Sequence, residues 1–257
     1  MLLKPWEELP SVMQQPEVRP YYEKLSKRRA SLVLKRCFDI VVSSFMLVIL
    51  SPIFIIISLW IVIDSKGGVF YRQERITTYG ENFYIFKFRT MVQNADKIGS
   101  LVTVNNDSRV TRAGKFLRGL RLDELPQLIN VLLGDMTFVG TRPEVRKYVD
   151  AYSPEMLATL LLPAGVTSKA SIHYKDEAEL LNSAEDVDET YVEEVLPGKM
   201  YYNLKEVEEF SFAGDIKTMF QTVFAVLGLL KTEEPLPAQV TSISPDGEEK
   251  ERESVNV

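Results

Sequence analysis

IVVSSFMLVILSPIFIIISLWIVI, which occupies residues 40–63, is an uncharged apolar run with a Ser-Pro pair at its midpoint. As an unbroken helix it would be roughly 36 Å long, enough to span a bilayer. Pro52 removes a backbone donor, so the sequence predicts a bend there, and Ser51 is placed to satisfy a freed carbonyl. The halves Ile40–Leu50 and Ile53–Ile63 would each be about 16 Å long, roughly half the hydrocarbon thickness.

Basic residues flank this run on both sides. Those upstream are Lys24, Lys27, Arg28, Arg29, Lys35 and Arg36, and those downstream are Lys66, Arg72 and Arg75. Positive charge favours the cytoplasmic side, so a simple crossing should carry more of it at one end than at the other. Two basic ends fit a helix–break–helix hairpin that returns to the face it entered. A kinked single crossing is the alternative, and the segment alone does not decide between them.

Length and composition limit the other possibilities. The 257 residues have room for one principal domain with appendages, and the opening MLLKPWEELP lacks the pattern of a signal peptide. A single cysteine, Cys37, excludes an internal disulfide framework and fits a reducing compartment. A single histidine, His173, leaves no Cys/His cluster for zinc, so any metal is expected to be a hard cation on carboxylate and phosphate oxygens.

The net charge of −6 conceals an asymmetry along the chain. Met1–Ala170 carries 23 Lys/Arg and 16 Asp/Glu, whereas Ser171–Phe210 carries 3 and 12, and Thr232–Val257 carries 2 and 7. The basic part suits anionic lipid or phosphorylated substrates. Its charges are dispersed among apolar segments, which argues against a nucleic-acid partner. The last stretch, rich in Glu, Ser and Pro, predicts a disordered acidic tail.

The expected fold class is α+β and helix-dominated, with a re-entrant membrane helix–break–helix, interfacial amphipathic helices and a small β-hairpin. The strands are Val69–Arg75 and Asn82–Met91, around Tyr79-Gly80. Helices are expected near Tyr21–Lys35, after a Pro-punctuated arm, and over Thr90–Ile98, Thr111–Arg121, Leu125–Leu133 (ending at Gly134), Pro154–Leu162 and Asp215–Leu230. Phe116, Leu117 and Leu120 alternate with basic residues at spacings suited to a helix in the headgroup layer.

Four parts follow from these patterns. They are an N-terminal arm with a basic helix (1–34), the membrane helix–break–helix (35–66), a principal domain (67–231) and the disordered acidic tail (232–257). The family resemblance described below implies that the second part is a re-entrant hairpin and that the third is a catalytic domain on the cytoplasmic face.

Two adjacent carboxylates, Asp123 and Glu124, precede Pro126 by a few residues. Pro is tolerated in the first turn of a helix, so the pair should lie at or just before a helix N-terminus, where free amides favour negative charge. One interpretation is an N-cap Asp with a supporting Glu, which spacing alone favours. The other is a functional pair, since a helix N-terminus also attracts phosphate.

Cationic residues surround this pair in the sequence. Arg118 and Arg121 precede it and Arg142 follows in Gly-Thr-Arg-Pro-Glu. Carboxylates ringed by arginines beside a membrane suit phosphoryl transfer, in which arginine neutralises phosphate oxygens and a carboxylate acts as nucleophile or holds Mg²⁺. Lys87 and Arg89 would share one face of a strand, either as a second cationic site or as an ordinary solvated face.

The combination of motifs is more informative than its members. In order they are KRCFDI (35–40), the apolar run broken at Ser51-Pro52, YRQER (71–75), FKFRTM (86–91), DSRVTRAGKFLR (107–118), LDELPQLINVLLGDM (122–136) and FVGTRPE (138–144). This order resembles the bacterial sugar transferase family, the monotopic polyprenyl-phosphate phosphoglycosyl transferases that begin glycan assembly. The close match covers roughly residues 35–144.

The resemblance implies transfer of a sugar-1-phosphate from a UDP-sugar to undecaprenyl phosphate, with release of UMP, at the cytoplasmic face of the bacterial inner membrane. It implies that Asp123 is the nucleophile that forms an aspartyl-phosphosugar, and that Glu124 is associated with Mg²⁺, possibly with Asp123. Lys87, Arg118 and Arg142 fall on positions linked to phosphate handling, and we assign Arg89 to the same group. The family's re-entrant helix favours the hairpin at Ser51-Pro52.

Two segments depart from the family pattern. Thr141 stands where Pro is usual, and Leu162–Ser168 (LPAGVTS) lacks the arginine of the usual Arg-Pro-Gly-Ile-Thr-Gly, with the spacing altered by one residue. Lys169 or Lys175 could supply the missing charge, whereas His173 is not expected to be a catalytic base. An inactive membrane scaffold that recruits glycan enzymes is the competing hypothesis, and a homodimer is possible. The sugar and the glycan pathway are not given by the sequence.

Overall fold

The apolar run forms parts of two helices that meet at Leu50. In the computed structural model, which describes residues 3–95, 107–174 and 186–229, α2 (Arg29–Ile49) and α3 (Ser51–Asp64) are bent by 61°. The Ser51 hydroxyl donates to the Val48 carbonyl at 2.8 Å, as the Ser-Pro pair predicted. Among the described residues, no single helix is long and apolar enough to cross a bilayer. The bent pair α2–α3 meets that criterion of length and composition when its two helices are taken together.

A polar stripe on α2 holds the helix to the rest of the protein. Lys35, Asp39 and Ser43 are buried at helical spacing. Lys35 Nζ donates to the Val139 carbonyl at 2.6 Å and forms an ion pair with Asp215. Asp39 accepts from the Thr137 hydroxyl and from the Phe138 amide, which both belong to a buried strand at residues 136–139. Since α2 begins at Arg29, it runs through the boundary expected between residues 34 and 35.

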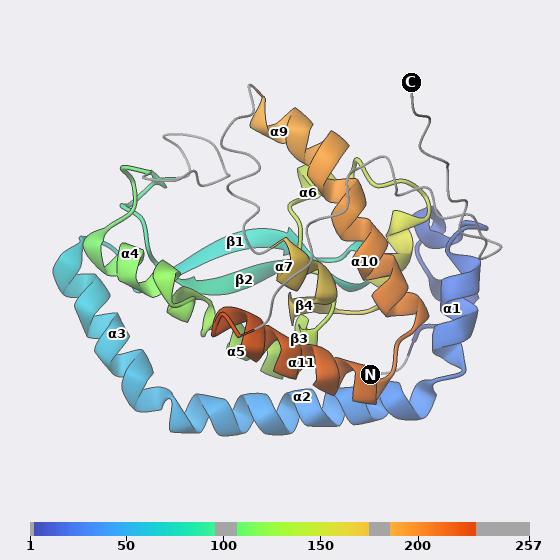
Figure 1. The fold of residues 1–257 in the computed structure, drawn as a ribbon, viewed down its shortest axis with the longest axis horizontal. Coiled ribbons are helices and arrows are strands. Elements are labelled where there is room, and N and C mark those ends of the chain that lie inside the picture. Colours follow the sequence, from blue (N-terminus) through green and yellow to red (C-terminus); the bar gives the residue numbers. More distant parts are fainter. Residues whose placement is uncertain (1–2, 96–106, 175–185, 230–257) are drawn as a thin grey trace.

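The predicted β-hairpin is present. β1 (Phe70–Ile76) pairs antiparallel with β2 (Asn82–Phe88), with Gln73 opposite Ile85. The turn between them is a short 3₁₀ segment, η3 (Thr78–Gly80), in which Tyr79 and Gly80 have φ values of 58° and 77°. Figure 1 shows the hairpin crossing the middle of the molecule above α2.

A second, parallel pair of strands was not predicted. It consists of β3 (Met136–Val139) and β4 (Ala164–Thr167). All four residues of β3 are buried, so its sequence shows no alternation of polar and apolar positions. A Cβ atom on Gly165 would lie 2.1 Å from the Gly140 carbonyl oxygen, which shows how closely the two backbones approach.

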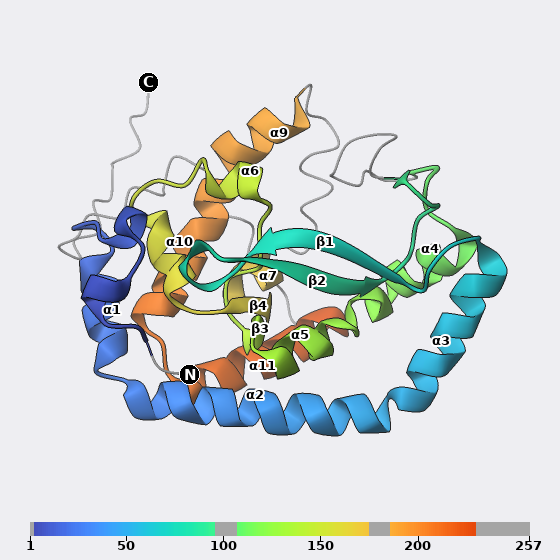
Figure 2. The same ribbon diagram turned by 180° about the vertical axis from the view of Figure 1, so that it is seen from behind.

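Helices and short turns surround these strands (Figures 1 and 2). They are η1 (Trp6–Glu8), η2 (Ser11–Met13), α1 (Arg19–Ser26), α4 (Arg112–Gly119), η5 (Leu122–Glu124), α5 (Gln127–Leu133), α6 (Arg146–Val149), η6 (Met156–Leu161), α7 (Lys169–His173), α9 (Val187–Thr190), η7 (Tyr191–Val195, a π-helical turn), α10 (Leu196–Glu208) and α11 (Phe212–Val226). The class is therefore α+β and helix-dominated, as predicted.

Three helix predictions need correction. Thr90–Asn94 is not helical, because Met91 forms a β-bridge with Val110. Ala95 is in a 3₁₀ conformation, and the rest of the predicted Thr90–Ile98 helix lies outside the described residues. Pro154–Leu162 forms the 3₁₀ segment η6 instead of an α-helix. The basic stretch is split at residues 27–28 between α1 and α2. The predicted tail, 232–257, lies outside the described residues.

Candidate functional site

A cavity of about 530 Å³ lies between the β-hairpin and the chain from α4 to η5. Six basic side chains line it together with Asp123 and Glu124, so positive charge predominates on its wall. The basic residues are Arg75, Lys87, Arg89, Arg109, Arg118 and Arg121. A concave site with this charge suits a multiply charged anionic ligand.

Asp123 and Glu124 lie in a tight turn between two helices. α4 ends at Gly119, and Arg121, in the left-handed region at φ 54°, is the N-cap residue of η5. Pro126 then stands at the N-cap position of α5, which has no side-chain cap. The pair precedes a helix N-terminus as predicted, but Asp123 does not cap that helix, so the interpretation as an N-cap is wrong.

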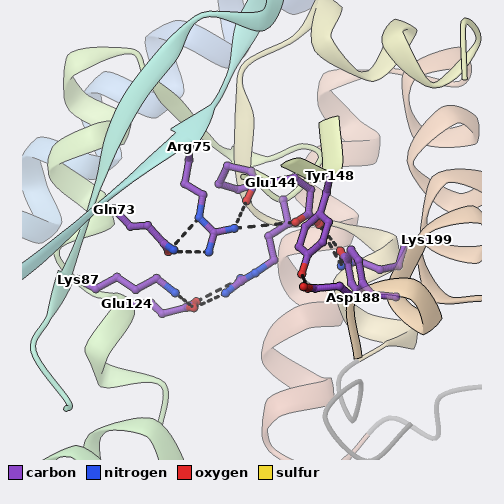
Figure 3. Close-up of polar contacts among 11 residues, drawn as sticks. Gln73, Arg75, Lys87, Glu124, Glu144, Tyr148, Asp188 and Lys199 are labelled. Atoms are coloured by element: carbon purple, nitrogen blue, oxygen red, sulfur yellow. Dashed lines mark hydrogen bonds and ion pairs between the residues drawn. The ribbon is translucent and has the colours of Figure 1, made fainter. Parts of the chain in front are cut away.

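Glu124 is the hub of the charged contacts in this cavity. Its Oε1 accepts from Lys87 Nζ at 2.9 Å and from the Arg142 guanidinium, while Oε2 lies 3.5 Å from Arg142 Nη1. Figure 3 shows Lys87 and Glu124 pointing toward each other. Burial acts to raise the pKa of Glu124, but the positive charges of Arg142 and Lys87 outweigh it and hold that pKa well below its ordinary value.

Asp123 has the opposite electrostatic environment. Burial, followed by the negative charge of Glu124, raises the pKa of Asp123, and the charges of Lys87 and Arg118 only partly oppose this. A partly desolvated carboxylate is a stronger nucleophile than a fully solvated one. The two adjacent carboxyl groups therefore differ: Glu124 is fixed in ion pairs, and Asp123 faces the cavity with its cations nearby.

Arg118 is held by a contact across the cavity wall. Its Nε donates to the Thr90 hydroxyl at 2.8 Å. The Thr90 carbonyl in turn accepts from the Thr111 amide, which fixes the start of α4 against the end of β2. Gly114 makes this approach possible, because a Cβ there would lie 2.0 Å from the Thr90 carbonyl oxygen.

Arg142 lies on a loop that β4 supports. The Gly165 amide donates to the Thr141 carbonyl at 2.8 Å, and the Gly140 amide donates to the Thr167 carbonyl at 2.9 Å. The segment Leu162–Ser168, which differs from the family pattern, therefore contains strand β4, and this strand supports the loop that carries Arg142. Its leucine at position 162 is buried, in keeping with a packing role.

Arg89 has backbone partners that the prediction of a phosphate-binding role did not include, and that role stays a prediction. It lines the cavity, but its guanidinium donates to the Ser65 carbonyl at 2.7 Å, to the Lys66 carbonyl and, at 3.4 Å, to the Ile61 carbonyl. These carbonyls end α3, so the charge of Arg89 serves the C-terminus of that helix. The strand pattern could not reveal this contact, which joins segments distant in the sequence.

Sequence reasoning missed Arg75 and Gln73 as site residues, although both lie in the YRQER motif. Gln73 Oε1 accepts from Arg75 Nη2 at 2.7 Å, and both side chains line the cavity (Figure 3). His173 stacks on Tyr202 with ring centroids 4.2 Å apart, and it does not appear in the cavity wall. Lys169 pairs with the carboxylate of residue 209, and Lys175 lies outside the described residues.

The carboxylates fit one kind of magnesium site. Mg²⁺ commonly uses one or two carboxylates and completes its shell with substrate phosphates and water. The described residues contain no group of three or more metal-ligating side chains, so only the Asp123–Glu124 pair is available to such an ion here. Glu124 Oε1 accepts from two cations and Oε2 makes one longer contact, of 3.5 Å, to Arg142, so Asp123 and Glu124 Oε2 are the groups that could ligate such an ion.

The chain is similar to proteins that act on phosphorylated substrates, in agreement with the cationic cavity. A family model described as bacterial sugar transferase matches residues 30–229. The chain is similar to a UDP-glucose:undecaprenyl-phosphate glucose-1-phosphate transferase of Klebsiella pneumoniae, at 36% identity over 200 residues, covering 76% of this chain and 40% of the relative.

Two further relatives broaden the comparison. A UDP-N-acetylgalactosamine-undecaprenyl-phosphate N-acetylgalactosaminephosphotransferase of Aeromonas hydrophila is 32% identical over 197 residues, covering 76% of this chain and 44% of the relative. The exopolysaccharide production protein ExoY of Rhizobium meliloti (strain 1021) is 30% identical over 207 residues, covering 75% and 84%. The chain thus spans less than half the length of the first two relatives and most of the third.

Proposed function

The chain belongs to the bacterial sugar transferase family, and from that premise we propose that it transfers a sugar-1-phosphate from a UDP-sugar to undecaprenyl phosphate. UMP is released, and the product begins a glycan. One observation carries the proposal: an accessible Asp123 lies next to an ion-paired Glu124 in a cationic cavity large enough for a nucleotide sugar.

In the proposed reaction Asp123 attacks the phosphorus that bears the sugar. A carboxylate oxygen of Asp123 forms a bond to this phosphorus. At the same time the bond between the phosphorus and the bridging oxygen of the diphosphate breaks, and its electron pair leaves with UMP. A phosphate oxygen of undecaprenyl phosphate then attacks the same phosphorus and releases the Asp123 carboxylate. Two steps allow UMP to leave before the lipid reacts.

The cations have separate parts in this scheme. Lys87 and Arg142 hold Glu124. Lys87 lines the cavity and would neutralise oxygens of the transferring phosphoryl group, whereas Arg142 does not line it and reaches the site through Glu124. Arg118, held by Thr90, faces the same cavity and would bind the diphosphate bidentately. We propose that Asp123 and Glu124 would hold Mg²⁺ beside the diphosphate, where the ion would offset its charge.

The membrane supplies the second substrate. The exposed apolar side chains of α3 include Ile55, Ile56, Leu59 and Ile63, and α4 exposes Phe116 and Leu120 nearby. We propose that the bent α2–α3 pair enters and leaves the cytoplasmic face of the inner membrane, so that the cavity meets the lipid headgroup at the interface. Cysteine labelling that placed Met1 and a residue after Asp64 on opposite faces would refute re-entry.

UMP release by the detergent-solubilised protein tests the proposal, with undecaprenyl phosphate, Mg²⁺ and a panel of UDP-glucose, UDP-galactose and UDP-N-acetylgalactosamine. We expect release with at least one donor and its loss in Asp123→Asn. Asp150→Asn, an exposed substitution of the same kind, should behave as wild type. Substantial turnover by Asp123→Asn would exclude Asp123 as nucleophile, and donor binding without turnover by wild type would favour an inactive scaffold.

A further inference from the structure

A buried carboxylate lies two residues beyond Arg142. Glu144 is 7% exposed, and Lys199, which reaches it from α10, is 5% exposed. Lys199 Nζ is 3.3 Å from Glu144 Oε1 and 2.7 Å from the Tyr191 hydroxyl, which donates to the same carboxylate. Arg75 Nη1 lies 3.9 Å from Oε2. In Figure 3 the Arg75, Glu144 and Lys199 side chains follow one another beside the Lys87–Glu124 pair.

The backbone of this segment is fixed at several points as well. The Glu144 carbonyl accepts from the Ile76 amide at 3.0 Å, and the Pro143 carbonyl accepts from Arg75 Nη1 at 3.1 Å. The Thr141 carbonyl accepts from β4. The segment 141–144 is therefore held by β4 at one end and by β1, Tyr191 and Lys199 at the other, and Arg142 extends from its middle to Glu124.

We propose that Lys199 is a positioning residue for the transfer reaction: by pairing with the buried Glu144 it holds the 141–144 segment so that Arg142 reaches Glu124. The proposal rests on the proposed function of the cavity. Lys199 lines no part of that cavity in the described structure, so its effect passes through Glu144 and the loop. Nothing in the sequence spacing joins Lys199 to this site, since 55 residues separate it from Glu144.

The electrostatic balance at Glu144 depends on Lys199. The titratable groups that face Glu144 are Arg75 from β1, Lys199 from α10 and the tyrosines Tyr148, Tyr152 and Tyr191, of which Tyr148 donates to Asp188. Burial acts to raise the pKa of Glu144, but Lys199, followed by the Tyr191 hydroxyl and Arg75, lowers it below the ordinary value. Without Lys199 the ion pair that remains to this carboxylate among the described residues is the one with Arg75, at 3.9 Å.

Loss of Lys199 should therefore make the position of the 141–144 segment depend on pH. In Lys199→Met, burial raises the pKa of Glu144, so the carboxyl is neutral below that pKa and is accommodated in place. Above it the buried carboxylate keeps only the long Arg75 ion pair and the Tyr191 hydroxyl as partners, and the segment shifts to expose it. Arg142 then leaves Glu124, and activity falls as the pH rises.

The test compares UMP release by four proteins at about pH 6 and about pH 8.5: wild type, Lys199→Met, the double variant Lys199→Met/Glu144→Gln and Lys205→Met, an exposed lysine on the same helix. We expect Lys199→Met to lose about 10- to 100-fold in kcat at the higher pH and to regain at least about tenfold relative to wild type at the lower pH. The double variant should show no such pH dependence, and Lys205→Met should match wild type.

A Lys199→Met profile parallel to that of wild type would overturn the inference, as would a loss that Glu144→Gln does not relieve at high pH. Binding of UDP, measured by calorimetry on the same proteins, provides a readout that does not need turnover. If wild type released no UMP, the proposed function would fail, while pH-dependent loss of UDP binding in Lys199→Met alone would still support the positioning role. UDP affinity unaffected at both pH values would contradict it.

Discussion

Substitution of Gly165 by alanine tests how the loop that carries Arg142 is supported. The new Cβ would lie 2.1 Å from the Gly140 carbonyl oxygen and 2.3 Å from its amide nitrogen, both backbone atoms that cannot rotate away. Relief of this contact requires the two backbones to separate by about 1 Å, since an ordinary carbon–oxygen contact is about 3.2 Å or longer. Two hydrogen bonds would then be broken: the one from the Gly165 amide to the Thr141 carbonyl (2.8 Å) and the one from the Gly140 amide to the Thr167 carbonyl (2.9 Å).

The expected magnitude follows from these two bonds and the forced separation. Each of the two lost hydrogen bonds costs about 0.5–1.5 kcal/mol, and overpacking costs about 1–3 kcal/mol, so we expect Gly165→Ala to lower the free energy of unfolding by about 2–6 kcal/mol. Because Arg142 lies on the displaced loop, a shift of about 1 Å should also reduce kcat by about 100-fold in the protein that remains folded.

Gly119→Ala provides the matched control. Gly119 ends α4, and a Cβ there meets no atom within 4 Å, so this variant should be as stable as wild type or up to about 1 kcal/mol more stable. Urea unfolding in a fixed detergent, followed by tryptophan fluorescence, measures both proteins, and UMP release measures the loop. A Gly165→Ala protein within 1 kcal/mol of wild type and fully active would refute the reasoning, because the close approach would then be dispensable.

Two further predictions concern charged groups away from Asp123. Burial, with the nearby Asp215, raises the pKa of Glu206 from 4.5 to about 7, so stability should fall as the pH rises between those values and Glu206→Gln should abolish that fall. Unfolding at about pH 8 should show a gain of about 1–3 kcal/mol for Glu206→Gln, and equal pH dependence in both proteins, with Glu208→Gln as the more exposed control, would contradict it. Arg89→Met should destabilise the protein by about 2–3 kcal/mol, because it leaves the carbonyls at the end of α3 without a donor. A raised KM for the UDP-sugar at unchanged stability would instead support the predicted role of Arg89 in binding phosphate.

Local features could be predicted from the sequence where one or two residues determine them. The break between α2 and α3 follows from Pro52 and Ser51, and the hairpin follows from alternating strands around Gly80. The end of α5 at Gly134 follows from a residue with φ 100°. In each case the chemistry acts within a few residues of the sequence, so no knowledge of the fold was needed.

Features that depend on distant contacts could not be predicted in this way. β3 is buried on both faces and shows no alternation, and β4 is a short strand whose pairing depends on contact between Gly140 and Gly165. The carbonyls that Arg89 binds belong to α3, so its place in the strand pattern indicated nothing about its role. Lys199 likewise contributes through a carboxylate on a different segment.

The adjacent carboxylates illustrate why the contacts, and not the residue types, assign roles at this site. Glu124 holds Lys87 and Arg142 together, so its removal would disperse two cations at once, and a loss of activity in a Glu124 variant would not identify a nucleophile. Asp123 makes no such ion pair within 4.0 Å among the described residues, so its substitution would remove the proposed nucleophile with less effect on the cations. Neighbouring carboxyl groups whose pKa values are moved in opposite directions are suited to different tasks. The low-pKa member, Glu124, therefore organises the cationic wall, which leaves the raised-pKa member, Asp123, for the role of nucleophile that we propose.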